Sequence, residues 1–167
     1  MSGTIEVLDG GRVIAFSFED VLKYHGPGSP GGAAHAFKVL ERAFALLSPD
    51  GPPRRRELSV RTSFGGPGAR DGFEAVTRAV TGDRYTVDKS LARPELGRTR
   101  ENFVFEVGYE GASVTLLLRD GYVVDEFIDL VRKDDRSDEE KARLEVLKQE
   151  LAERVMGSPA VDVYDEA

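Results

Sequence analysis

The sequence predicts a single-domain α+β protein, and three observations lead to this prediction. The chain has 167 residues, a length that suits one hydrophobic core. Two stretches alternate apolar and polar residues on either side of a glycine turn, as antiparallel hairpins do. Several other stretches repeat apolar residues every three or four positions, which is typical of amphipathic helices. We find no internal repeat and no interdomain linker.

The first half of the chain begins with a predicted hairpin over residues 5–15, turning at Asp9-Gly10-Gly11. Ser17 and Asp20 then form a capping box for a helix that ends with His25. The following stretch, residues 26–32, combines two prolines with four glycines and must interrupt the helix. A second helix is predicted from apolar residues on one face, which are Ala33, Phe37, Leu40, Phe44 and Leu47. Further apolar residues on its opposite side indicate that this helix is covered on two sides.

The middle of the chain is predicted to hold short strands and one more helix. Residues 58–64 alternate as a strand that ends in Gly65-Gly66-Pro67-Gly68, and residues 73–80 form a helix that stops near Gly82. A short strand is expected at residues 85–87. The clearest hairpin covers residues 103–118, with its turn at Glu110-Gly111.

The C-terminal part is predicted to be helical. Residues 123–131 indicate one helix, and Ser137 with Glu140 forms the capping box of the last one. The apolar stripe of this last helix consists of Leu144, Leu147, Leu151 and Val155. It is available for a partner helix or for packing on the chain's own core. The helix should end at residues 157–159, and we expect the acidic tail beyond it to be mobile.

The composition excludes several classes of function. The chain has no cysteine and two histidines, which excludes disulfides, thiol nucleophiles, cysteine-ligated zinc and a three-histidine site within one protomer. Thirty acidic residues against 23 basic ones give a net charge of −7, which argues against nucleic-acid binding. The apolar runs are far too short to span a membrane. With no secretory signal visible, we expect a cytoplasmic protein.

The two glycine-proline loops are the predicted small-molecule site, because backbone without side chains can approach a ligand closely. Ser29, Gly31 and Gly68 are candidate substrate-binding residues within the loops or at their ends. Arg70 is a fourth candidate that could bind an anionic group, or it could be only solvated. Asp71 could take part in catalysis or could cap the helix.

Each histidine supports two interpretations. His25 lies where an apolar helix face meets the first loop, and it could act as a general base or a metal ligand. The alternative is a partly buried histidine bonded to a loop carbonyl. His35 could be a further metal ligand, or a core or interface residue whose ring is hydrogen-bonded.

The stretch Tyr24-His25-Gly26-Pro27-Gly28-Ser29-Pro30-Gly31 resembles the FmdE-like family of formylmethanofuran dehydrogenase subunits. That family has an aromatic residue followed by His-Gly-His-x-Cys-Pro-Gly. Here Pro27 stands where the second histidine is usual and Ser29 where the cysteine is usual. Gly68 takes the position of another family cysteine, and Asp71-Gly72-Phe73-Glu74 that of an acidic tetrapeptide. The chain therefore resembles a divergent member without the family cysteines.

The resemblance implies that helices pack on a mixed, largely antiparallel sheet in residues 1–133. Residues 134–167 would then add a C-terminal helix and tail. It also implies a homodimer with a pocket between the two loops, where family members bind a metal through histidine and cysteine. Two functions stay open for this chain. One is binding of a small molecule or a cofactor, such as zinc or haem, with catalysis through His25. The other is a non-enzymatic accessory or oligomerisation module.

Overall fold

A computed structural model describes residues 3–167 and confirms the α+β fold. The helices are α1 (Phe18–His25), α2 (Pro30–Leu47), α3 (Pro67–Thr77), α4 (Asp125–Arg132), α5 (Asp138–Met156) and the one-turn α6 (Ala160–Val163). The strands are β1 (Ile5–Asp9), β2 (Arg12–Phe16), β3 (Ser59–Thr62), β4 (Tyr85–Val87), β5 (Val104–Tyr109), β6 (Ala112–Leu118) and β7 (Tyr164–Glu166).

The main sheet has five strands in the order β4-β3-β5-β6-β7. Only β3 and β4 run parallel, and the other neighbours are antiparallel. The sheet is therefore mixed and largely antiparallel, as expected. The β5–β6 hairpin turns at Glu110-Gly111 as predicted, and both turn residues have positive φ. β1 and β2 form a separate hairpin that turns at Gly10-Gly11.

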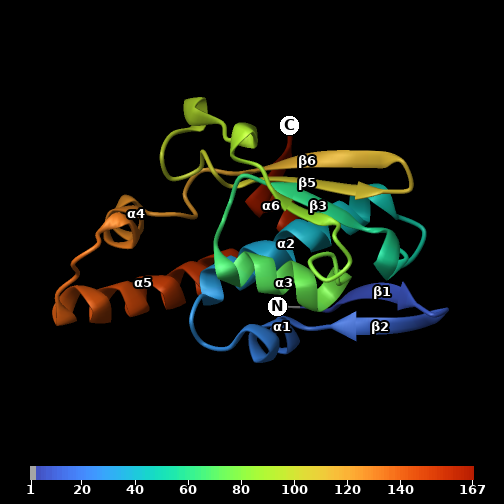
Figure 1. Ribbon diagram of the computed structural model, residues 1–167, viewed down its shortest axis with the longest axis horizontal. Helices are drawn as coiled ribbons and strands as arrows, with labels where there is room; N and C mark the ends of the chain where they lie inside the picture. The colour runs from blue at the N-terminus through green and yellow to red at the C-terminus, as the bar shows by residue number, and fades with distance from the viewer. Residues whose placement is uncertain (1–2) are drawn as a thin grey trace.

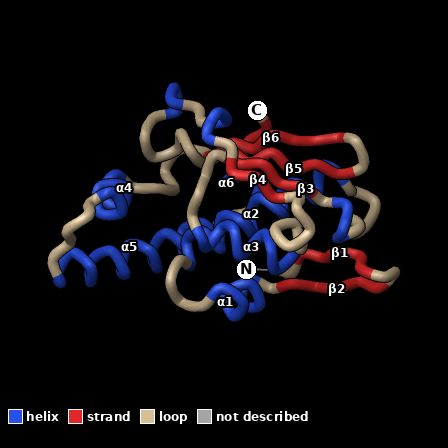
Figure 2. Tube along the Cα trace, viewed as in Figure 1, coloured by secondary structure: helices blue, strands red, loops and turns tan. Residues whose placement is uncertain are grey.

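Helix α2 lies at the centre of the molecule, between the sheet and the layer formed by α1 and the β1–β2 hairpin (Figures 1 and 2). Every residue from Ala33 to Leu40 is buried, including His35 and Lys38. The sequence has apolar residues on two sides of this helix, and a helix with this pattern must be covered on both sides. α3 lies beside α2, and the C-terminal half of α5 packs against α2 as well.

Both predicted capping boxes are present. Ser17 accepts a hydrogen bond from the backbone of Asp20, while the Asp20 carboxylate accepts one from the backbone of Ser17. Ser137 and Glu140 make the same reciprocal pair at the start of α5. These contacts involve residues three positions apart, which is why the sequence alone could predict them.

Two local expectations were wrong. Helix α3 begins at Pro67 and ends at Thr77, because Arg78 adopts a left-handed conformation with φ of 55°, so Val80 lies outside it. The tail, which we expected to be mobile, forms α6 and β7 instead. Tyr164 of β7 is fully buried and its backbone pairs with Leu118 of β6. Burial of this one aromatic ring and the free edge of β6 fix the tail in the sheet.

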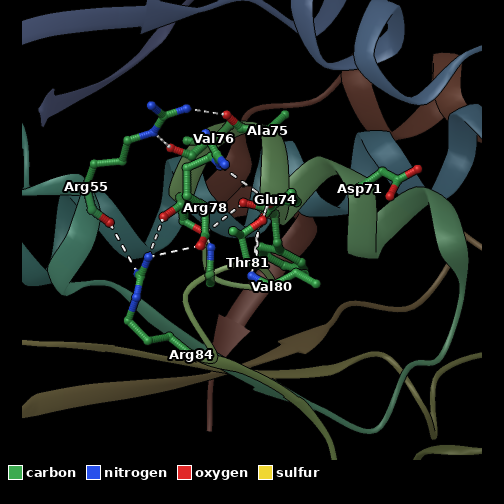
Figure 3. A network of polar contacts seen from close by, with 12 residues as sticks. Arg55, Asp71, Glu74, Ala75, Val76, Arg78, Val80, Thr81 and Arg84 are labelled. Atoms are coloured by element: carbon green, nitrogen blue, oxygen red, sulfur yellow. Dashed lines mark hydrogen bonds and ion pairs between the residues drawn. The ribbon is translucent and has the colours of Figure 1, made fainter.

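A network of arginines and Glu74 holds the C-terminal end of α3 (Figure 3). Arg55 donates hydrogen bonds to the carbonyls of Ala75 and Val76, and Arg84 donates to those of Thr77 and Arg78. These bonds satisfy carbonyls that a helix end leaves without partners. Glu74 accepts hydrogen bonds from Thr81 and from the backbone of Val80. Arg55 is thus a structural residue.

Helix α4 and the N-terminal half of α5 project from one side of the molecule (Figure 1). They pack on each other through a small cluster of Leu130, Leu144 and Leu147, with Phe127 against it. The whole predicted stripe of α5 is buried within the chain. The stripe therefore packs on this chain's own residues and is not free for a partner helix. No helix in residues 3–167 is long and apolar enough to cross a membrane.

Candidate functional site: a cavity between the two glycine loops

The two glycine loops line one cavity of about 520 Å³. The first loop and the start of α2 contribute Ser29, Gly31 and Gly32, and the loop before α3 contributes residues 64–68. The opposite wall comes from α4, α5 and the segment that precedes β5. The side chains of these elements that line the cavity are Arg98, Asn102, Phe103, Phe127, Ile128, Val131, Arg132, Arg136, Leu144, Lys148 and Leu151, with Lys89 beyond β4.

The glycines at this site have a packing role, because α2 and α3 touch through their backbones. A Cβ atom on Gly68 would lie 2.3 Å from the carbonyl oxygen of Ser29. A Cβ atom on Gly32 would lie 2.8 Å from the backbone nitrogen of Ala69. On the other side of α2, a Cβ atom on Gly31 would lie 2.7 Å from Cδ2 of Leu151. The close crossing of α2 and α3 therefore requires Gly32 and Gly68 and brings the two loops together.

His25 connects the two loops through both ring nitrogens. Its Nδ1 lies 2.8 Å from Oδ2 of Asp71 on α3, and its Nε2 lies 3.1 Å from the backbone nitrogen of Ser29. The backbone N–H of Ser29 can only donate, so Nε2 accepts and Nδ1 carries the proton that Asp71 receives as a hydrogen bond. Only 8% of the His25 side chain is exposed. The ring fixes the first loop onto the start of α3.

The predicted site residues divide into two groups. Ser29, Gly31 and Gly68 line the cavity, and their role in binding stays a prediction. His25, Asp71 and Arg70 are absent from its lining. Arg70 is largely exposed, and its guanidinium lies 3.4 Å from Oδ1 of Asp71. Asp71 does not cap α3, because it lies inside the helix, whose N-cap is Gly66.

We expect replacement of His25 by Ala to release the first loop. The variant should lose about 1–2 kcal/mol of stability in urea unfolding, since a partly buried carboxylate and a backbone N–H lose their partner. Amide exchange should rise at residues 26–29. Tyr24→Ala, which removes an exposed neighbouring side chain, is the matched control and should change neither quantity. Equal exchange in both variants would show that His25 does not hold the loop.

His35 lies apart from His25, in the core. Its Nδ1 is 2.7 Å from the hydroxyl of Tyr164, and the centroid of its ring lies 4.6 Å from that of the Phe103 ring, with the two planes tilted by 37°. Its Nε2 is buried and has no hydrogen-bond partner among the described residues. Burial lowers the pKa of His35 to about 3. His25 and His35, the two predicted metal ligands, therefore bond to different residues and lie apart. In residues 3–167, no three side chains of His, Asp or Glu are grouped so that they could hold a metal ion.

The sequence did not reveal the basic residues of the cavity wall. They are Lys89, Arg98, Arg132, Arg136 and Lys148. No local motif connects them, because they come from the segment after β4, the segment before β5, α4, the loop that follows α4, and α5, which only the tertiary fold brings together. The apolar periodicity of α4 and α5 predicted two helices but not the surface against which they would close.

Helices α2 and α3 begin at this cavity in an unusual way. Both have proline in the first turn, no side-chain cap and no acidic residue in the first turn. Helices α1 and α5, which begin elsewhere, have a side-chain cap and acidic residues in the first turn. Within residues 3–167, the backbone N–H groups of Gly31, Gly32 and Gly68 make no hydrogen bond. These donors add positive potential to the two loop ends.

No protein-family model matches this chain, and no curated protein is significantly similar to it. The fold and the geometry of the cavity therefore carry the functional argument.

Proposed function

We propose that this protein is a small-molecule-binding domain whose site is the cavity between the two glycine loops. The observation that carries the proposal is that both loops, which are far apart in the sequence, line one cavity of about 520 Å³. This volume lies in the range of small-molecule sites, which are mostly apolar with a few polar groups. The lining has this character, with Phe103, Ile128 and Leu151 beside Ser29 and Asn102.

In this proposal His25 positions the site instead of reacting in it. Both of its nitrogens are used within the chain, and it holds Ser29, which lines the cavity. Asp71 in turn orients the ring of His25. The resemblance to the FmdE-like family supports a pocket at the same two loops. The proposal keeps that pocket and assigns it to a ligand bound without the family cysteines.

Closing the cavity mouth should remove binding. Val131 of α4 lines the cavity and is 48% exposed, so a tryptophan there can extend over the opening without disturbing the core. Val146 of α5 is also 48% exposed but does not line the cavity. We expect fragments detected by saturation-transfer NMR to bind the unmodified chain and Val146→Trp. Their binding to Val131→Trp should be at least tenfold weaker, because the indole fills the volume that they would occupy.

The fragment library should contain neutral, anionic and cationic compounds in equal numbers, so that the test does not depend on ligand charge. Both tryptophan variants should first show unchanged thermal unfolding. Fragments that bind all three chains equally would contradict the proposal, and so would a library without any binder.

A further inference from the structure

The cavity has a charge that is opposite to that of the whole chain. Five Lys or Arg residues line it and no Asp or Glu does, although the chain has a net charge of −7. Three of the five have carboxylate partners outside the lining. Arg98 pairs with Asp125 and Asp129, Arg132 with Glu101, and Lys148 with Glu145. The charges of these three are thus balanced by carboxylates in direct contact with them, although none of the carboxylates lines the cavity.

The other two basic residues have no carboxylate partner among the described residues. Arg136 is engaged at the end of α4, where it donates to the carbonyls of Leu130 and Lys133. Lys89 donates one hydrogen bond, of 2.9 Å, to the carbonyl of Ser63. This leaves two of its three ammonium hydrogens available.

The ammonium group of Lys89 lies beside the second glycine loop. A Cβ atom on Gly65 would be 3.4 Å from Nζ of Lys89, so the absence of a side chain at Gly65 keeps this charge accessible. This ammonium, which has no carboxylate partner among the described residues, therefore lies next to the start of α3, where the backbone N–H of Gly68 makes no hydrogen bond. A positive side chain and the positive N-terminal end of a helix dipole, both at one end of a cavity, favour an anionic group there.

Apart from Ser29, Asn102 and the glycine loops, the remaining wall is apolar. It consists of Phe64, Phe103, Phe127, Ile128, Val131, Leu144 and Leu151. Val131 is 48% exposed and Phe64 and Phe127 are half-buried, and a simple inorganic anion would leave the apolar surface of these three in water. An anion that carries an aliphatic or aromatic body would cover them, at about 25 cal/mol for each Å² of apolar surface removed from water.

We infer that the ligand of this cavity is an amphiphilic anion, a carboxylate or phosphate attached to an apolar body, with its charged group held by Lys89. This inference rests on the proposed function, since it names the ligand class of the same cavity. The carboxylate and the phosphate share the chemistry that the site recognises, and the experiment distinguishes them.

Titration calorimetry with four probes of equal chain length tests the inference. The probes are octanoate, octyl phosphate, octanol and octylamine. We expect the two anions to bind at least tenfold more tightly than octanol and octylamine, and their affinity to fall with added NaCl because salt screens the charge. The tighter of the two anions identifies the head group.

Lys89→Met should weaken binding of the anions about tenfold, which is the effect of losing one charge-assisted hydrogen bond. Lys89→Arg should retain most of the affinity. Lys141→Met is the matched control, because Lys141 is exposed on α5, lies outside the cavity lining and changes the net charge equally. It should bind as the unmodified chain does. Unchanged thermal unfolding of Lys89→Met confirms that the loop remains folded.

Two results would overturn the inference. One is octanol or octylamine binding as tightly as octanoate, and the other is equal losses of affinity in Lys89→Met and Lys141→Met. If none of the probes binds while neutral or cationic fragments still distinguish Val131→Trp from Val146→Trp, the ligand class is wrong and the proposed function stands. If those fragments fail as well, both are wrong.

Discussion

Replacing Gly68 with Ala should destabilise the protein by about 3 kcal/mol, at the upper end of the cost of overpacking. The new methyl group would lie 2.3 Å from the carbonyl oxygen of Ser29 and 3.1 Å from the backbone nitrogen of Ala33. Both obstacles are backbone atoms, so no side-chain rotation can relieve the clash and α2 must move away from α3. Thermal unfolding should shift downward by about 10 °C for a chain of this size.

Two matched variants separate this effect from a general cost of changing glycine to alanine. Gly51→Ala meets nothing within 4 Å and should leave the stability nearly unchanged. Gly72→Ala would place its methyl group 2.7 Å from Cβ of Ala36, which is a side-chain atom. Adding Ala36→Gly should therefore recover part of the loss at position 72. If Gly68→Ala were as stable as Gly51→Ala, the backbone contact between α2 and α3 would be contradicted.

Acidification should destabilise the protein through His35. Burial lowers the pKa of this residue in the folded chain to about 3, from an ordinary value of 6.5. Between these two values the unfolded chain binds a proton that the folded chain does not, so stability is complete above pH 6.5 and falls as the pH decreases toward 3. The slope is about 1.4 kcal/mol for each pH unit. At pH 4.5 the loss from this residue should reach about 2–3 kcal/mol.

Urea unfolding between pH 7 and pH 4.5 measures this effect, and two variants identify its source. Tyr164→Phe removes the hydroxyl that bonds to His35 but keeps the imidazole, so it should retain the slope. The double variant His35→Leu/Tyr164→Phe leaves no hydroxyl without a partner and should show a flatter profile than Tyr164→Phe. Equal slopes in the two variants would show that His35 is not the residue that titrates.

Features that depend on neighbouring residues were predictable. The capping boxes of α1 and α5 each join two residues that are three positions apart, and the Gly10-Gly11 turn requires positive φ that glycine adopts freely. The apolar faces of α2 predicted its central position because a helix that is apolar on two sides must be covered on both. In these cases the local pattern and the tertiary structure obey the same constraint.

The end of α3 and the C-terminal tail were not predictable in the same way. α3 ends at Thr77, where Arg78 turns left-handed and where Arg55 and Arg84, from other segments, bind carbonyls at the helix end. The tail is ordered because β6 has a free edge and the core has room for the ring of Tyr164. A polar, acidic stretch carries no sign of either. Both outcomes depend on contacts between residues that are distant in the sequence.

The candidate site shows the same division. The sequence by itself determined that two glycine-proline loops precede helices, and Ser29, Gly31 and Gly68 do line the cavity. Only the tertiary structure decided that His25 and Asp71 are absent from the lining and hold these loops together. It also decided that Lys89 and the side chains of α4 and α5 complete the wall. The physical reason is that glycine acts through its own backbone, whereas a cavity is formed by side chains from segments that meet only after the core has packed.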